Sequence, residues 1–420
     1  MDVLNRFSSL SVMWMTSVLF FLSISSCAAT ARSVSFASRL PKFTSITPAA
    51  VFGEDDRQDL PSELEALKRS IGLVYSNRAR SVCTGFCVAP NVVATASHCL
   101  FRTEGEQRPL LRRFRFSLKA SKQQMESPIE GYSTGNPAQF VIAGSRQLRV
   151  VPPIDATRDW ALMRLERPIC KGAVLKILNT SIENLQAKEN SGHLIQVAFH
   201  NDFADWRLAY SGACETVSLD GRITKQQLAR DFVTFDSLFL HGCDTGGASS
   251  GSPLFWRGAD NDLHVVAINV GTYMQTRMLT ERGSVVRRYK AGALANTALE
   301  AQKIQVLLSY FSKAKIIRSA SDLRDLQLEL KRRGFYNGAI DGSFGPATRL
   351  AIQNYRGISG EGGELAGLPT QRLLNNLLPD RATKSRNKVS LTSSPSSVKK
   401  KKKAISPSQP SLVESFIYPD

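Results

Sequence analysis

The chain from Gly72 to about Gly292 is a succession of short apolar runs separated by Gly, Asn and Pro. The runs LHVVAINV and VTFDSLFL are typical, because they place β-branched and aromatic residues over about eight positions. Such runs are too short and too branched for helices, and turn residues at this spacing separate strands. The pattern therefore predicts a β-rich domain over this stretch.

The period of the apolar residues changes near Thr297. Five residues then recur at largely helical spacing: Leu299, Ile304, Leu307, Leu308 and Phe311. This spacing predicts an amphipathic helix that closes the β-rich domain.

A smaller helical unit of about 60 residues is predicted after the basic connector KAKIIRSA. Ser321 is expected to cap its first helix, which ends at Gly334. Pro346 opens a second helix that runs through Tyr355, and the turn-rich sequence NGAIDGSFG lies between the two. Three leucines share one face of the first helix: Leu323, Leu326 and Leu330.

Composition and charge limit the class of protein. A length of 420 residues leaves room for two or three domains, and the 42% hydrophobic content is that of globular protein. The formal net charge of +18 predicts attraction to anionic polymers such as wall glycans, lipid head groups or nucleic acid, without choosing among them. Nothing after the amino terminus approaches the roughly 18 apolar residues of a membrane span, which excludes a multi-span membrane protein.

The amino terminus has the three-part layout of a secretory signal. Arg6 precedes the apolar run VMWMTSVLFFLSI, and the small residues SSCAATA follow, with an A-x-A site that ends at Ala31. Residues 1–31 therefore predict export to the periplasm or the extracellular space. Two alternatives remain: ISSC as a lipoprotein processing site with Cys27 as the lipidated residue, and an uncleaved anchor, which the short, Ser-interrupted run disfavours.

The carboxyl terminus is a basic tail. After Pro379 the chain is rich in Ser, Pro and Lys, with nine Lys and Arg residues against three acids, and it contains the run Lys399 to Lys403. Residues 380–420 are too polar to bury a core and are predicted to be disordered. Lysines without interleaved aromatic residues predict general attraction to anionic envelope polymers rather than specific recognition of nucleic acid.

Cysteine usage points to an oxidising compartment. Six cysteines remain once Cys27 is removed with the signal: Cys83, Cys87, Cys99, Cys170, Cys214 and Cys243. An even number permits three disulfides. There is no CxxC pair, and the five histidines do not flank cysteines at metal-finger spacing, so we expect neither a metal nor a cofactor.

Three short motifs carry the candidate chemistry. ATASHC places His98 at the end of an apolar strand, DWALMRL places Asp159 before a second strand, and GGASSGSPLF places Ser250 in a loop before a third. Each alone is more typical of a packed histidine, a turn or a loop. Together they stand in the order His, Asp, Ser within one β-rich segment, at separations of 61 and 91 residues.

With these motifs the segment from about 51 to 312 resembles the trypsin-like serine proteases, and most of all their bacterial glutamyl-endopeptidase-like branch, whose serine motif ends in SGSP. The resemblance implies a mainly β fold, a trypsin-like double β-barrel followed by the small C-terminal α-helical domain. VFGEDDR from Val51 resembles the mature amino terminus of this branch. Residues 32–50 would then be a propeptide or linker.

The resemblance assigns roles to the three motifs. Ser250 is the nucleophile, His98 the general base and then acid, and Asp159 the carboxylate that fixes the imidazole tautomer. A serine hydroxyl needs a neighbouring base to become nucleophilic, and a neutral imidazole can remove its proton near pH 7. Backbone N–H groups of Ala248 and Ser250 would form the oxyanion hole. Ser249 offers an adjacent hydroxyl, but the SGSP register favours Ser250.

The sequence departs from the family at Ala248, where the usual residue is glycine. A Cβ disfavours the left-handed conformation that turns this N–H into the oxyanion hole, although Gly246 and Gly247 can compensate. Two interpretations follow: an active endopeptidase, or a noncatalytic wall-binding or interaction protein with a degenerate protease domain.

Substrate-binding residues are also implied by the resemblance. AINVG aligns with the strand that pairs with the substrate backbone, which gives Asn269, Val270 and Gly271. Asn269 stands where glutamate-specific relatives have a histidine, so a preference for Glu is doubtful. Asp244 stands six residues before Ser250, either as a pocket carboxylate for Arg or Lys or as an Asp that hydrogen-bonds its own loop.

The resemblance also bears on the disulfides. It places Cys83 and Cys99 as a bridge beside the catalytic histidine. Cys214 and Cys243 would pair before the nucleophile loop, and the pair Cys87 and Cys170 remains by elimination.

The sequence LRDLQLELKRRGFYNGAIDGSFGPATRLAIQNY is similar to the peptidoglycan-binding domain of bacterial wall hydrolases, over residues 320–379. In this motif Asp341 and Gly342 make a tight turn, Phe344 packs into the core and Gly345-Pro346 starts a helix. The two resemblances together imply a secreted serine endopeptidase that acts on proteins or peptides and is held at the wall by its peptidoglycan-binding domain.

Overall fold

The computed structural model describes residues 50–77, 81–101, 111–118, 125–149, 152–188, 192–203, 206–219, 223–258, 260–281, 284–358, 365 and 367–379. The predicted signal with Cys27, all but the last residue of the predicted propeptide or linker, and the predicted tail lie outside these ranges. No helix within them is long and apolar enough to cross a membrane.

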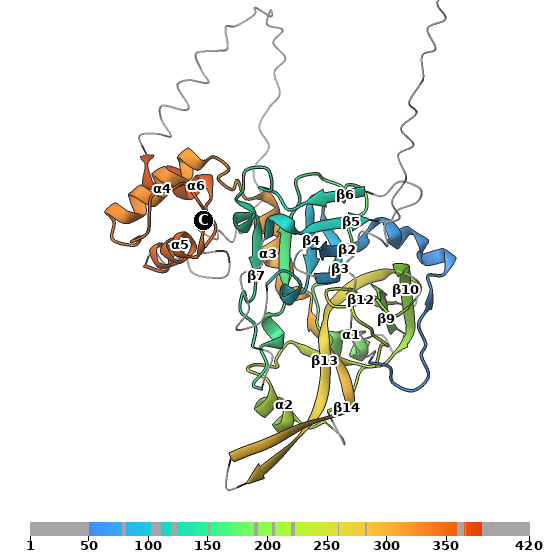
Figure 1. Ribbon diagram of the computed structural model, residues 1–420. Coiled ribbons are helices and arrows are strands. Elements are labelled where there is room, and N and C mark those ends of the chain that lie inside the picture. Colours follow the sequence, from blue (N-terminus) through green and yellow to red (C-terminus); the bar gives the residue numbers. More distant parts are fainter. Residues whose placement is uncertain are drawn as a thin grey trace, which may run out of the picture.

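Two seven-stranded antiparallel sheets form the larger part of the molecule (Figure 1). The first sheet has the order β6-β5-β2-β3-β4-β8-β7. Its strands are β2 (Ile71–Ser76), β3 (Ser81–Ala89), β4 (Val92–Thr95), β5 (Arg115–Leu118), β6 (Met125–Pro128), β7 (Val141–Ala143) and β8 (Ala161–Arg164).

The second sheet has the order β1-β10-β9-β12-β13-β14-β11. Its strands are β1 (Gln58–Asp59), β9 (His193–Phe199), β10 (Leu208–Cys214), β11 (Leu238–His241), β12 (Pro253–Arg257), β13 (Leu263–Glu281) and β14 (Ser284–Glu300). β13 and β14 continue beyond the sheet as a long hairpin (Figure 1). The predicted mainly β class, with a small helical domain at the carboxyl end, is confirmed.

Close packing of the first sheet depends on small residues at its centre. All six residues of β2 are buried, and Gly72 pairs with Gly85 of β3. A Cβ on Gly72 would lie 2.3 Å from the carbonyl oxygen of Ser117, so only glycine allows β5 to approach this closely. The apolar faces of the two sheets contribute to one continuous core.

The helices of the β-rich domain are short: α1 (Ile182–Lys188), α2 (Lys225–Asp231) and α3 (Gln302–Lys313). The predicted closing helix is α3, but it begins at Gln302 rather than near Thr297, because Thr297 and Leu299 pair with β11 as part of β14. Of the run VTFDSLFL, only the last three residues belong to a strand.

The C-terminal domain contains α4 (Ala320–Arg332), α5 (Pro346–Ile358) and α6 (Gln371–Leu377), which enclose a separate apolar core. The N-cap of α4 is Ser319, whose side chain accepts a hydrogen bond from the Asp322 N–H, and not Ser321 as predicted. Ser319 has the extended backbone that a cap requires, whereas Ser321 already lies within the helix.

The IDGSFG turn is organised by one buried amide. Gln327 of α4 accepts a hydrogen bond from the Gly342 N–H, and its Nε2 lies 2.9 Å from Asp341 Oδ1 and 3.0 Å from the Ser343 carbonyl. Gly342 has a φ of 74°, which glycine adopts without strain, and Phe344 is buried in the domain core. The predicted structural roles of these turn residues therefore agree with their contacts.

The two domains are packed together (Figure 1). Gln139 Nε2 donates to the Ile317 carbonyl at 2.7 Å. Glu130 accepts a hydrogen bond from Arg318 at 2.9 Å and forms an ion pair with Arg164 of β8 at 2.9 Å. Because Glu130 and Arg164 are buried, this contact fixes the helical domain against the first sheet.

Candidate active site

His98 and Asp159 form a hydrogen-bonded pair beside the first sheet. His98 lies in a turn after β4, and Asp159 lies in the turn before β8. Asp159 Oδ2 lies 2.7 Å from His98 Nδ1, and Oδ1 accepts hydrogen bonds from the His98 N–H at 3.0 Å and from Ser97 Oγ at 3.1 Å. The carboxylate is thus held from two sides.

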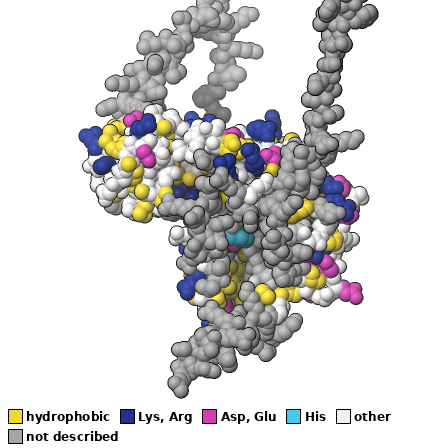
Figure 2. Space-filling model, viewed as in Figure 1, with side chains coloured by type: hydrophobic (Ala, Val, Ile, Leu, Met, Phe, Trp, Pro, Cys, Tyr) yellow, Lys and Arg dark blue, Asp and Glu magenta, His cyan; other side chains and the backbone are white. Residues whose placement is uncertain are grey.

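The electrostatics of this pair favour a basic imidazole. Burial lowers the pKa of His98, but the charge of Asp159 and the hydrogen bond with it outweigh burial and raise that pKa above its usual value. The side chain is 29% exposed, and its Nδ1 is held by the carboxylate. Figure 2 shows a histidine side chain at the surface of the viewed face.

Ser250 and His98 share a neighbour, the sulfur of Cys99. Cys99 Sγ is 3.8 Å from His98 Nε2 and 3.9 Å from the Ser250 carbonyl oxygen, so one sulfur atom contacts both residues. The Ser250 carbonyl also accepts a hydrogen bond from the Thr84 N–H at 3.0 Å. The structure therefore brings His98 and Asp159 into direct contact, and it places the backbone of Ser250 beside the cysteine sulfur that contacts His98.

One residue of the loop before Ser250 has a left-handed backbone. Ala248 has a φ of 78°, in the left-handed region, in spite of its Cβ. Thr84 Oγ1 donates to the Ala248 carbonyl at 2.8 Å and accepts from the Phe199 N–H at 3.0 Å. Among the residues that the structure describes, neither the Ala248 N–H nor the Ser250 N–H has an acceptor.

A stability prediction follows from this φ. Replacing Ala248 by glycine should raise the free energy of unfolding by about 0.5–1 kcal/mol, because the left-handed cost of alanine exceeds the entropy that glycine loses on folding. Urea unfolding measures this change. Turnover should stay within about twofold, since the loop already has the required conformation. A several-fold rise in turnover would mean that Ala248 leaves this conformation in part of the molecules.

Ser249 differs from Ser250 in its surroundings. Ser249 is buried, and Asn269 Nδ2 donates to its carbonyl at 3.2 Å and lies 3.3 Å from its Oγ. Ser250 is partly exposed. A hydroxyl that is buried and bonded to an amide is poorly placed to reach a substrate, which agrees with the SGSP register.

The side chain of Asn269 does not line a pocket, in contrast to the expectation from the sequence. It is 1% exposed, and its Oδ1 lies 3.2 Å from His241 Nε2. Because Nδ2 faces the Ser249 carbonyl, Oδ1 is the acceptor and His241 donates from Nε2. Val270 follows as a bulge between β13 and β14, and Gly271 pairs with Thr297.

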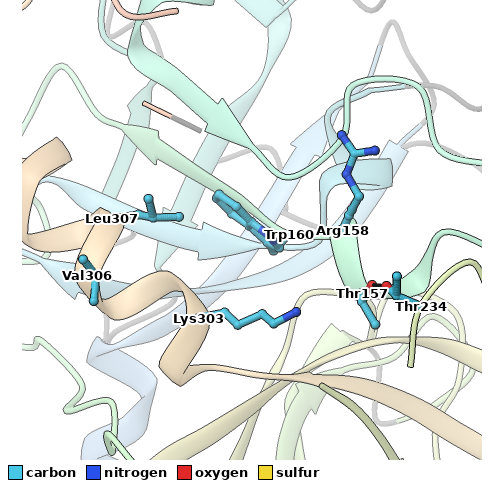
Figure 3. A pocket seen from close by; sticks show the side chains of 7 residues that line it. All are labelled: Thr157, Arg158, Trp160, Thr234, Lys303, Val306 and Leu307. Atoms are coloured by element: carbon cyan, nitrogen blue, oxygen red, sulfur yellow. Dashed lines mark hydrogen bonds between the residues drawn. The ribbon is translucent and has the colours of Figure 1, made fainter. Parts of the chain in front are cut away.

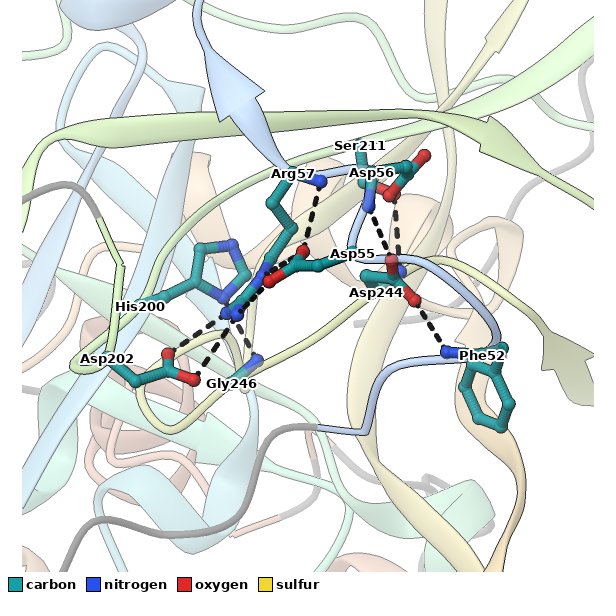
Figure 4. A network of polar contacts seen from close by, with 9 residues as sticks. All are labelled: Phe52, Asp55, Asp56, Arg57, His200, Asp202, Ser211, Asp244 and Gly246. Atoms are coloured by element: carbon teal, nitrogen blue, oxygen red, sulfur yellow. Dashed lines mark hydrogen bonds and ion pairs between the residues drawn. The ribbon is translucent and has the colours of Figure 1, made fainter.

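Asp244 is also not a pocket carboxylate. Its Oδ1 accepts from the Phe52 N–H and its Oδ2 from the Asp56 N–H, both at 2.8 Å (Figure 4). The residue is 2% exposed, and the neighbouring Thr245 pairs with Ala50. The interpretation of Asp244 as a receptor for Arg or Lys is therefore wrong. It binds the segment that begins at Ala50 rather than its own loop.

A second network holds the same loop (Figure 4). The buried Arg57 forms ion pairs with Asp55 at 2.7 Å and with Asp202 at 3.0 Å. His200 Nδ1 accepts a hydrogen bond from the Gly246 N–H at 3.0 Å, so this imidazole is neutral in the folded chain. Sequence reasoning missed His200 and Asp202, whereas Asp55 and Arg57 lie within VFGEDDR and Gly246 lies in the serine motif.

The buried histidines predict acid lability. Burial, followed by the charge of Arg57, lowers the pKa of His200 to about 3, and burial lowers the pKa of His241 to about 4. In the unfolded chain both histidines bind a proton below about pH 6.5, whereas in the folded chain they stay neutral. The two neutral histidines therefore contribute to the free energy of unfolding above that pH. This contribution is lost as the pH falls toward 4 for His241 and toward 3 for His200. Together the two histidines should lower the free energy of unfolding by about 3–4 kcal/mol when the pH falls from 7 to 5.

Urea unfolding of the oxidised protein at these two pH values measures the loss. H200Q keeps an acceptor for Gly246, and this variant should lose about half of the pH dependence. An unchanged pH dependence would show that His200 is not the buried neutral group.

Three disulfides join the six described cysteines: Cys83–Cys99, Cys87–Cys170 and Cys214–Cys243. These are the pairs expected from the sequence. In the described ranges, the ring of His98 and the sulfurs of Cys83 and Cys99 form a cluster of ligand atoms within 4.8 Å of one another. Both sulfurs are in the disulfide, so they offer no thiolate to a metal.

A cavity of about 350 Å³ is lined by residues that flank Asp159 in the sequence (Figure 3). It is lined by Thr157, Arg158, Trp160, Thr234, Lys303, Val306 and Leu307. Neither His98 nor Ser250 contributes to it, so it is not the place where a scissile bond would lie.

Comparisons with known proteins agree with this geometry. The model of the trypsin family matches residues 65–283, more than half of the chain. The chain belongs to the trypsin family. The family predicted from the three motifs is thus confirmed.

The helical domain of this trypsin-family chain matches the family described as a peptidoglycan binding domain, over residues 319–357. One similar solved structure is that of a Glu endopeptidase in complex with MPD. Its sequence is 16% identical to this chain, and the match covers 63% of this chain and 99% of the other chain. Its TM-score of 0.37 carries no argument about specificity. A search of curated proteins found no match.

Proposed function

We propose that the chain is a secreted serine endopeptidase that cleaves peptide bonds with Ser250, His98 and Asp159. The observation that carries this proposal is the pairing of His98 Nδ1 with Asp159 at 2.7 Å, with Cys99 Sγ in contact with both His98 Nε2 and the Ser250 carbonyl. The carboxylate fixes the proton on Nδ1, which leaves Nε2 free to accept the proton of Ser250.

The reaction passes through an acyl-enzyme. Ser250 Oγ attacks the carbonyl carbon as His98 Nε2 takes its proton, and the oxyanion is bound by the N–H groups of Ala248 and Ser250. His98 then gives the proton to the leaving amine, which breaks the peptide bond. Water, activated by the same imidazole, hydrolyses the ester. The left-handed Ala248 supports an oxyanion hole that exists before substrate arrives.

The substrate backbone is proposed to lie along Val270 and Gly271 of β13. The carbonyl and N–H of Asn269 bond to Gly251 and Ser252, so this residue joins the strand to the nucleophile loop. Asn269 and Asp244 are positioning residues in this proposal, because their side chains hold the nucleophile loop and the amino-terminal segment.

A protease assay tests this function. The purified chain should cleave an unstructured protein such as casein, and a serine-reactive sulfonyl fluoride should remove the activity. Cleavage that resists this reagent and is removed by a metal chelator would point to another mechanism.

The same proposal places the protein at the cell wall. The match to a peptidoglycan binding domain and the three disulfides support a wall-associated protein outside the cytoplasm. Lys and Arg side chains are visible over the helical domain and the first sheet (Figure 2). We propose peptidoglycan as the partner of the helical domain and anionic envelope polymers as partners of the tail, after cleavage of the signal.

Wall binding should have two parts. Residues 380–420 carry a net charge of +6, and exposed charges are screened beyond about 10 Å at 0.1 M salt. Ending the chain at Pro379 should therefore weaken sedimentation with purified peptidoglycan at low salt and leave it unchanged at 0.5 M salt. If the shortened chain fails to sediment at either salt concentration, the tail rather than the helical domain is the tether.

A further inference from the structure

Two arginines meet where the helical domain contacts the first sheet. Arg146 lies in the loop after β7, and Arg349 lies in the first turn of α5. Arg146 Nη2 donates to the Val141 carbonyl at 2.7 Å, and Arg349 Nη2 lies 3.4 Å from the same oxygen. The two nitrogens are therefore within roughly 6 Å of each other, close enough to repel.

Each guanidinium is also fixed in place. Arg349 Nη2 donates to the Ala138 carbonyl at 2.9 Å, and its Cζ lies 4.9 Å from the centre of the Phe344 ring. Arg146 Cζ lies 4.7 Å from the centre of the Phe101 ring. These contacts come from both domains, so the pair is held by the domain junction rather than by one flexible loop.

The charge of this pair is not balanced by the described part of the chain. No described carboxylate forms an ion pair with Arg146 or Arg349, whereas Glu130 nearby is occupied by Arg164 and Arg318. The bonds at Nη2 leave the other N–H donors of each guanidinium for a further acceptor. Both side chains are only partly buried, so solvent and small solutes can reach them.

The electrostatics of the junction agree. Burial lowers the pKa of Arg146 to about 10, and burial together with the charge of Arg146 lowers the pKa of Arg349. A negative charge between the two positively charged guanidiniums would counteract both shifts and raise the pKa of each arginine.

We propose that Arg146 and Arg349 form an oxyanion-binding site at the domain junction, and that its ligand is a carboxylate of a peptidoglycan stem peptide. Two planar guanidiniums fit a carboxylate through paired N–H···O bonds. The choice of ligand rests on the proposed wall binding, because the second arginine belongs to the domain that matches the peptidoglycan binding family. Wall peptide bound here would touch both domains and strengthen their contact.

The test is a calorimetric titration of the full chain with N-acetylmuramyl-L-alanyl-D-isoglutamine, a wall fragment with one free carboxylate. The wild type should bind it at least tenfold more tightly than the same fragment with that carboxylate amidated. R146Q and R349Q should each lose about this factor, and R318Q should stay within twofold, since Arg318 has its own carboxylate in Glu130. The far-ultraviolet circular dichroism spectra of R146Q and R349Q should match that of the wild type, which shows that the variants fold.

Two results would overturn the proposal. Equal binding of the free and amidated fragments would mean that the carboxylate is not recognised. Binding of inorganic phosphate but not of the wall fragment would leave an anion site with another ligand. None of these titrations uses whole peptidoglycan, so failure of the tether is detected separately, by sedimentation.

Discussion

Replacing Ser250 by alanine is expected to reduce turnover by at least about 10⁴-fold, to the level that the oxyanion hole and substrate binding alone can sustain. Without Oγ no acyl-enzyme forms, and His98 has no hydroxyl to activate. Steady-state hydrolysis of a peptide substrate by the wild type and by the variant gives the ratio of their turnover numbers. Affinity for the substrate should change little, because Oγ contributes mainly to the transition state.

The matched control is S249A. Ser249 is buried and its carbonyl is bonded to Asn269, so loss of its hydroxyl should change turnover by less than about tenfold. Equal losses in both variants would point to damage to the loop rather than to chemistry. A large loss in S249A with an active S250A would show that the chosen nucleophile is wrong.

Replacing Asp159 by asparagine is expected to cost about 10⁴-fold in turnover. Asp159 Oδ2 accepts the Nδ1 proton at 2.7 Å, whereas an asparagine can turn its NH₂ group toward Nδ1. That amide would favour the tautomer with the proton on Nε2, which cannot accept a proton from Ser250. The remaining bonds of Oδ1 to the His98 N–H and Ser97 keep the variant folded in the same geometry.

The pH profile provides a second readout for Asp159→Asn. The carboxylate raises the pKa of His98, and the active form is neutral imidazole. Thus kcat/KM of the wild type should fall as the pH drops through a value above 6.5, and in D159N this fall should move to lower pH. An acid limb at the same pH in both proteins would mean that another group controls activity.

The candidate chemistry-bearing residues could be singled out from the sequence. His98, Asp159 and Ser250 each follow or precede an apolar strand, and the prediction rests on their order at separations of 61 and 91 residues and on the family resemblance. The same holds for Gly342 and Phe344 in the helical domain, where turn residues and a buried ring lie within one motif.

Side-chain direction could not be predicted in this way. Asp244 and Asn269 stand at positions that suggested a substrate pocket, yet their partners are Phe52, 192 residues away, and Ser249 in the adjacent loop. Nothing in the residues around Asp244 signals that its carboxylate binds the amino-terminal segment. Such pairings depend on how the two sheets pack, and that information is distributed over the whole core.

The helix boundaries show a related limit. The spacing of apolar residues predicted helix α3. Its start was predicted too early, because β14 continues through Leu299, where pairing with β11 outweighs the local helical spacing. The sequence predicts Ser321 as the cap of α4, whereas the extended backbone of a cap belongs to Ser319.

The central claim is that Ser250 is an activated nucleophile, and covalent labelling tests it most directly. The purified chain should react with a fluorophosphonate probe, and mass spectrometry of the digest should place the phosphonyl group on Ser250. Labelling should disappear in S250A and fall strongly in D159N. Absence of labelling in the folded wild type, or a label on any residue other than Ser250, would contradict the account.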